Sequence, residues 1–114
     1  MDFYFYNKCG TCRKAKKYLD ENDIPYNSID ITLNPPPKKI LKLAMAQKGM
    51  KKLFNTSGVE YKERKIKDKI KTMKESEALD LLASSGRLIK RPIAVEGDRI
   101  TVGYDADEFQ STWS

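Results

Sequence analysis

The sequence predicts an α/β fold in which a central mixed sheet carries helices on both faces. An aromatic run at residues 3–6 is followed by a helical pattern and then by a second strand. This β-α-β order implies a right-handed crossover and a parallel pair of strands. Near the end of the chain, two β-branched runs flank Gly97 and Asp98, which is typical of an antiparallel hairpin.

The opening strand and helix are the most clearly patterned part of the chain. The aromatic residues 3–6 suit a short buried strand. From residue 11 to 22 the pattern is helical, and Ala15 and Leu19 anchor its apolar face while lysines and an arginine cover the rest. The loosely alternating residues 26–31 are predicted as the second strand.

A mainly helical stretch separates the second strand from the hairpin. It begins after the prolines at 35–37, because proline lacks the N–H that a strand or a helix interior needs. Most of the remaining predicted elements are short apolar clusters bounded by turn or cap residues, whereas residues 61–71 are dense in charge. The remaining elements are a helix from residue 40 closed near Gly49, a turn of helix and a loop at 53–58, partial helix at 61–71, a helix at 76–85 with Gly86 as its stop, strands at 93–95 and 100–102, and a last helix from Asp105 to near Trp113.

Composition narrows the class of protein. The 114 residues suit a single domain covering 1–114. The N-terminus lacks a signal-peptide pattern, and no apolar run approaches the ~18 residues that span a membrane. We therefore expect a cytoplasmic monomer without membrane contact. The 22 Lys and Arg against 16 Asp and Glu give a net charge of +6, which fits a solvated surface, so direct nucleic-acid binding is not expected.

The chain has two cysteines, and they form a C-x-x-C motif between the first strand and the first helix. A helix N-terminus favours the thiolate, which is the reactive form of cysteine. Lys8 and Arg13 add positive charge beside the motif, and Gly10 and Thr11 separate its cysteines. The first cysteine of such a motif is usually the exposed one. We therefore predict that Cys9 attacks a substrate and that Cys12 resolves the resulting mixed disulfide.

Two other interpretations of the motif remain open. A closed zinc site needs four ligands, and the chain has no histidine and no third cysteine, so zinc would need carboxylates or a second chain. The two cysteines could also be an inert packed pair. Because thiols are kept reduced in the cytoplasm, a close pair there favours redox chemistry, and we expect no metal and no cofactor.

Three separated segments resemble the arsenate reductase ArsC / Spx family. They are the C-x-x-C opening at 9–15, the Leu53-Phe54-Asn55 segment with Tyr61, and the run 88–93 followed by 102–104. Within that family the chain is most similar to the YusI-like branch. The resemblance implies a thioredoxin-like fold with a helical insertion between the second and third strands, which corresponds to residues 34–86.

The resemblance also implies roles for two residues outside the C-x-x-C motif. Pro92 would form an active-site cis peptide bond beside the cysteines. Arg91 would hold an oxyanion near the catalytic cysteine, and its guanidinium would also favour a Cys9 thiolate. An ordinary trans proline at an edge strand and a surface arginine are the alternatives.

Positions at which the chain departs from the family pattern help to rank the functions found in that family. Two arginines that surround the anion in arsenate reductases correspond to Asn55 and Gly103 here. The first hypothesis is therefore a thiol–disulfide redox protein, with thioredoxin, glutaredoxin or glutathione as its thiol partner. The second is an Spx-like redox-sensing transcription regulator that binds the RNA polymerase α subunit, with Gly49 as a candidate contact. The third is an arsenate reductase.

Overall fold

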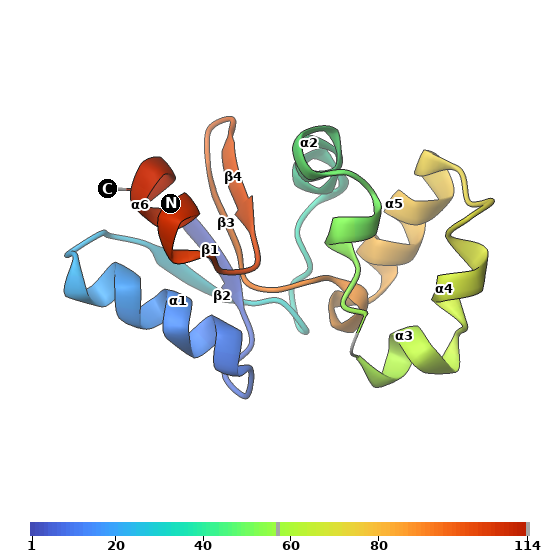
Figure 1. The fold of residues 1–114 in the computed structure, drawn as a ribbon, viewed down its shortest axis with the longest axis horizontal. Coiled ribbons are helices and arrows are strands. Elements are labelled where there is room, and N and C mark those ends of the chain that lie inside the picture. Colours follow the sequence, from blue (N-terminus) through green and yellow to red (C-terminus); the bar gives the residue numbers. More distant parts are fainter. Residues whose placement is uncertain (57, 114) are drawn as a thin grey trace.

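A four-stranded mixed sheet lies at the centre of the molecule, whose computed structural model describes residues 1–56 and 58–113 (Figure 1). The strands are β1 (Asp2–Phe5), β2 (Asn27–Asp30), β3 (Ile93–Glu96) and β4 (Arg99–Val102). Their spatial order is β2-β1-β3-β4. The pair β1 and β2 is parallel, whereas β3 is antiparallel to both of its neighbours. The predicted crossover and the predicted hairpin are therefore both present.

Helices cover both faces of the sheet, as predicted (Figure 1). They are α1 (Gly10–Glu21), α2 (Lys38–Lys48), α3 (Val59–Glu63), α4 (Ile66–Lys69), α5 (Glu75–Ser84) and α6 (Ala106–Trp113), with short 3₁₀ helices η1 (Lys51–Leu53) and η2 (Gly86–Leu88). Helices α1 and α6 lie on one side of the sheet, and α2 to α5 lie on the other. Within the described ranges, no helix is long and apolar enough to cross a bilayer.

Alternation along the strands builds a separate core on each face. Phe3 points toward α1 and α6 and packs with Ala15, Leu19 and Phe109. The neighbouring Tyr4 points to the other face and belongs to the larger core under α2 and α5. Because successive strand residues face opposite sides, one short aromatic strand can anchor both cores.

The chain between β2 and β3 is helical but also contains an extended contact that the sequence did not predict. Phe54 forms an isolated antiparallel bridge with Ile89. Two backbone hydrogen bonds flank it, from Asn55 N to Leu88 O at 2.8 Å and from Lys90 N to Leu53 O at 2.7 Å. The loop predicted at 53–58 therefore begins with a segment tied to the chain just before β3. Residue 57 of that loop and residue 114 of the predicted domain lie outside the described residues.

Gly86 has a different structural role from the predicted helix stop. Helix α5 already ends at Ser84, and Gly86 opens the next 3₁₀ helix. A Cβ atom at Gly86 would lie only 1.7 Å from the carbonyl oxygen of Ile31. The residue is therefore glycine because the chain after α5 passes directly against the end of β2.

Candidate active site

The first cysteine of the C-x-x-C motif lies between β1 and α1, directly before the first residue of the helix. Cys9 is the N-cap residue of α1, with extended backbone angles. Its N–H donates to the carbonyl of Tyr6 at 3.0 Å, and its own carbonyl accepts from the N–H of Arg13 at 3.1 Å. Cys9 is half-buried, whereas Gly10 and Thr11 between the two cysteines are exposed. A partner can therefore reach the Cys9 sulfur.

The second cysteine is enclosed by protein. Cys12 lies in the first turn of α1 and is only 1% exposed. The backbone N–H of Tyr6 donates to its sulfur across 3.4 Å. Both cysteines are free thiols in this structure. The helical spacing thus places one thiol at the surface and the other behind it.

The surroundings of Cys9 favour its thiolate. Partial burial by itself would raise the pKa of Cys9, but hydrogen bonding to its sulfur outweighs that cost and leaves the pKa lowered. The groups responsible are the backbone and side chain of Cys12, the guanidinium of Arg91 and the backbone of Thr11. Cys9 is therefore ionised at a lower pH than an ordinary thiol.

The surroundings of Cys12 act in the opposite direction. Burial, followed by the proximity of Cys9, raises the pKa of Cys12 to about 12, although the N–H of Tyr6 partly opposes the shift. Cys12 therefore stays protonated when Cys9 is ionised. A thiol that donates a hydrogen bond to a neighbouring thiolate is suited to resolving a mixed disulfide formed at that neighbour.

Arg91 acts on the Cys9 sulfur, and Pro92 follows it immediately before β3. The peptide bond that joins them is cis. The Arg91 guanidinium carbon lies 4.6 Å from the centroid of the Tyr6 ring, which is a cation–π contact. Its Nε atom is buried without a hydrogen-bond partner among the described residues. The sequence offered no signal for Tyr6, which looked like a strand residue but lies beyond the end of β1.

Lys8 and Arg13 are the two other cations predicted to support the thiolate. Lys8 and Arg13 are both exposed. The Nε of Arg13 donates to the carbonyl of Asn7 at 3.1 Å. Neither residue is among the groups that lower the pKa of Cys9. Within the part of the chain that the structure describes, the cation that acts on this sulfur is Arg91.

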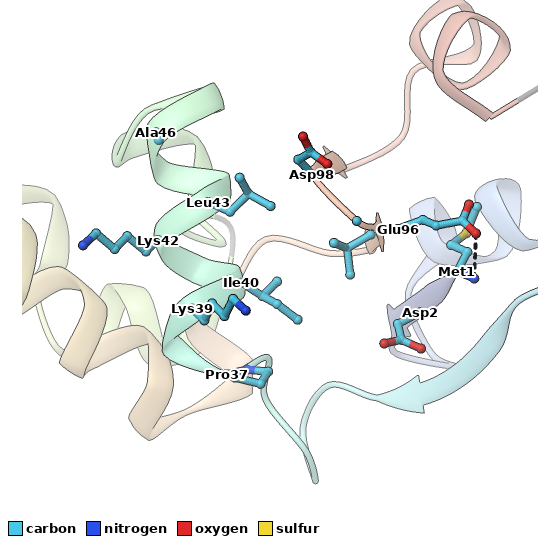
Figure 2. Close-up of a pocket in the computed structure, with 12 residues that line it drawn as sticks. Met1, Asp2, Pro37, Lys39, Ile40, Lys42, Leu43, Ala46, Glu96 and Asp98 are labelled. Carbon is cyan, nitrogen blue, oxygen red and sulfur yellow. Dashed lines mark ion pairs between the residues drawn. The ribbon is translucent and has the colours of Figure 1, made fainter.

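A separate apolar hollow lies away from the cysteines, between α2 and the β3–β4 hairpin (Figure 2). It measures about 890 Å³, and Ile40 and Leu43 project into it from α2. Glu96 and Asp98 stand on the opposite side. No thiol lines it, so the described reactive groups lie elsewhere. Across residues 1–56 and 58–113, no three His, Cys, Asp or Glu side chains are grouped to hold a metal ion.

The opposite pKa shifts predict how each thiol responds to alkylation. In a Cys12→Ser variant, Cys9 should react with iodoacetamide with a midpoint below the ~8.5 of a free thiol, because the rate follows the thiolate fraction. The rate should rise with pH up to that lowered pKa and then level off. In a Cys9→Ser variant, the buried Cys12 should stay almost unlabelled up to about pH 10.

Mass spectrometry of the labelled protein measures both profiles. Labelling of the urea-unfolded variants is the control, and both thiols should then titrate near the ordinary value. Faster labelling of Cys12 than of Cys9 in the folded protein would show that the assignment of the two thiols is reversed.

Comparison with known proteins identifies the relatives of the chain. The model of the ArsC family matches residues 4–112. The uncharacterised protein YusI of Bacillus subtilis is 48% identical over 100% of this chain and 98% of its own. The global transcriptional regulator Spx of Listeria innocua is 28% identical over 96% of this chain and 84% of its own. A crystal structure of an ArsC-family-related protein from Bacteroides fragilis superposes with a TM-score of 0.91 at 42% identity, covering 97% of this chain and 95% of that one. The thioredoxin-like α/β fold is therefore shared over nearly the whole length of the chain, and the chain belongs to the ArsC family.

Proposed function

We propose that this protein is a cytoplasmic thiol–disulfide oxidoreductase that cycles between a Cys9, Cys12 dithiol and an intramolecular disulfide. The observation that carries the proposal is the pair of opposite pKa shifts across one helical turn, lowered at Cys9 and raised at Cys12. An inert packed pair gives no reason for the less buried thiol to be the more acidic one.

The reaction proceeds in two balanced exchanges. The Cys9 thiolate attacks one sulfur of a partner disulfide, so a Cys9–partner S–S bond forms, the partner's own S–S bond breaks and its leaving thiolate takes a proton. Cys12 then loses its proton and attacks the Cys9 sulfur, which releases the second partner thiol. The partner gains two electrons, and the chain is oxidised to the Cys9–Cys12 disulfide.

Each other residue at the site has a defined part in this proposal. Arg91 stabilises the Cys9 thiolate, and Tyr6 supports the guanidinium from below through its ring. Pro92 has no N–H, so it adds no donor beside the sulfurs. Thioredoxin, glutaredoxin or glutathione would return the chain to its dithiol form by the same exchange run in reverse.

A Cys12→Ser variant tests the proposal, because it stops the reaction after the first exchange. Incubated in reduced form with a disulfide-bonded peptide, it should accumulate a mixed disulfide at Cys9 that mass spectrometry detects and dithiothreitol releases. The native chain should instead end as a monomer two protons lighter, with the peptide reduced. The Cys9→Ser variant is the matched control and should trap nothing. Intermolecular dimers alone, or sulfinic acid without any bridge, would contradict the proposal.

Arsenate reduction is a weaker candidate on the geometry of the anion site. A developing oxyanion needs several preorganised donors, and removing one can cost ~10²–10³-fold in rate. Two of the family's arginine positions are Asn55 and Gly103 here. At Gly103 a Cβ would lie 3.1 Å from Cε of Lys90, so the lysine side chain occupies the space where a larger residue would begin. An ammonium lacks the planar fork of the missing guanidinium.

A redox-responsive regulator is the second candidate function. The observation that favours it is the 28% identity to Spx over 84% of that protein's length. Under this alternative, disulfide formation between Cys9 and Cys12 would change the affinity for the RNA polymerase α subunit. Capture of the α subunit by the oxidised chain and not by the dithiol chain would favour regulation over catalysis.

A further inference from the structure

A polar cavity of about 450 Å³ is lined in part by Arg91. Tyr6 and Arg91 form one wall, and Thr32 lies at the end of β2. Helix α3 and η2 supply the remaining walls. Because Arg91 also acts on the sulfur of Cys9, a ligand in this cavity would share a guanidinium with the reactive thiol.

The cavity is lined by Arg64, Arg87 and Arg91, and two of these arginines have no ion-pair partner among the described residues. Arg64 is engaged, since its Nη2 lies 2.8 Å from Oε1 of Glu60. The other carboxylate oxygen of Glu60 accepts from the Ser85 hydroxyl at 2.8 Å. Among the described residues, no acidic side chain forms an ion pair with Arg87 or Arg91.

Two further carboxylates, those of Glu63 and Asp30, lie near the three arginines. Glu63 of α3 lines the cavity and is exposed. Hydrogen bonds from Thr32 and, to a lesser degree, the charge of Arg91 lower the pKa of Asp30, so Asp30 is an anion whose Oδ1 accepts two hydrogen bonds from Thr32. Arg87, exposed at the rim, is therefore the guanidinium most available to an incoming carboxylate.

The close approach at Gly86 explains why Arg87 stands here. Since a Cβ at Gly86 would meet the carbonyl of Ile31 at 1.7 Å, η2 lies directly on the end of β2. This contact places Arg87 and Thr32 around one cavity although they are far apart in the sequence. The position of Arg87 is therefore fixed by the packing of the main chain of η2 against the end of β2.

The two large apolar side chains that the described surface leaves most exposed also belong to this region. Val59, at 71% exposure, lines the cavity, and Leu33, at 76%, directly follows Thr32. Single exposed apolar residues are ordinary on a protein surface. Here Val59 lines a cavity that also holds three arginines, and Leu33 directly follows a second lining residue, so exposed apolar surface and cations occur together near the reactive thiol. This combination matches a peptide segment more closely than a small inorganic anion.

We propose that this cavity is the substrate cleft, and that it holds a segment of a disulfide-bonded protein with an acidic side chain and an apolar side chain next to the cysteine under attack. The acidic side chain contacts Arg87, with Arg91 between it and the sulfur, and the apolar side chain packs on Val59 or Leu33. This inference rests on the proposed oxidoreductase function and adds to it a class of substrate.

Three peptide disulfides that differ only in the residue after cysteine, which is Glu, Gln or Lys, test the cleft. The measurement is the second-order rate constant for their reduction by the reduced chain, divided by the rate constant with dithiothreitol to remove intrinsic effects of the peptide. At low ionic strength the normalised rate constant should be about tenfold higher for the Glu peptide than for the Lys peptide, the size of one favourable charge contact.

Variants separate the cleft from general attraction by the net charge of +6. Arg87→Gln should reduce the Glu-to-Lys ratio to about twofold, and Arg87→Lys should retain part of it. Arg99→Gln removes the same charge from β4, where Arg99 pairs with Glu96, and should leave the ratio unchanged. A second pair of peptides carries Leu or Ser before the cysteine. The native chain should reduce the Leu peptide several-fold faster than the Ser peptide, and the Val59→Ser variant should lose most of this difference.

Each outcome decides the matter. Equal normalised rates for the three peptides, or an unchanged ratio in Arg87→Gln, would overturn the cleft while leaving the oxidoreductase function intact. An equal fall of the ratio in Arg99→Gln would assign the preference to net charge and overturn the cleft. Failure of the native chain to reduce any of the peptides would overturn the proposed function, and the cleft with it.

Discussion

A Cys9→Ser variant should lose disulfide reduction to the level of the uncatalysed exchange. The expected fall is ~10³-fold or more, because removing a covalent nucleophile can cost as much as about 10⁶-fold in kcat. Cys12 cannot replace it, since burial raises the pKa of Cys12 to about 12 and only 1% of the residue is exposed. Turnover of a peptide disulfide in the presence of excess thiol measures the loss.

The thermal stability of the Cys9→Ser variant is the control, because it shows whether the protein is still folded. A hydroxyl in place of the Cys9 thiol leaves the buried Cys12 and both cores untouched, so the melting temperature should change little. Cys12→Ser should differ in kind, with a retained first exchange and a lost release step. Substantial turnover by Cys9→Ser would mean that Cys12 becomes accessible in solution and that the roles given to the two thiols are wrong.

A Gly86→Ala variant should be severely destabilised. The added Cβ would lie 1.7 Å from Ile31 O and 2.6 Å from the Ile31 carbonyl carbon, and both are backbone atoms that cannot rotate away. Either η2 or the end of β2 must move, so the loss should reach or exceed the upper end of the ~0.5–3 kcal/mol that most substitutions cost. A urea titration monitored by circular dichroism measures the change in the free energy of unfolding.

Gly10→Ala is the matched control for that experiment. A Cβ at Gly10 meets no atom within 4 Å, and the residue begins α1, so alanine should change stability by no more than about 1 kcal/mol and in the favourable direction. Equal stability of the two glycine variants would mean that η2 does not rest on β2 as described. The Gly86→Ala variant should also weaken the preference for acidic peptides, because the contact between η2 and the end of β2 positions Arg87.

Local pattern was enough to predict the elements that carry the cysteines. The aromatic run, the Ala15 and Leu19 spacing and the Gly97-Asp98 turn each act over a few residues, and the structure places β1, α1 and the β3–β4 hairpin within about one residue of the prediction. The hydrogen bond from Glu108 N to the Asp105 carboxylate likewise confirms the predicted cap of α6. These signals need no knowledge of the rest of the chain.

The surroundings of Arg91 could not be read from the sequence, because they depend on contacts between distant segments. Tyr6 sits under the guanidinium since the chain turns after β1, and nothing in the aromatic run distinguishes Tyr6 from its strand neighbours. Arg87 lies in η2 and Arg64 directly follows α3, and the two meet at one cavity through tertiary packing alone. The resemblance to a family marked Arg91 and Pro92, but it carried no information on residues peculiar to this chain.

The shared guanidinium of Arg91 couples two equilibria that are usually treated separately. Arg91 helps to ionise Cys9 and also lines the neighbouring cavity, so an anion in the cavity that reached its guanidinium would compete with the Cys9 thiolate for one cation. By thermodynamic linkage, the factor by which a bound anion would lower the acid dissociation constant of Cys9 equals the factor by which ionisation of Cys9 would lower the affinity for that anion. Oxidation to the disulfide removes the thiolate and relieves that competition. The redox state of the pair would therefore be felt as a change in binding affinity at a neighbouring surface, with no need for a movement of the backbone.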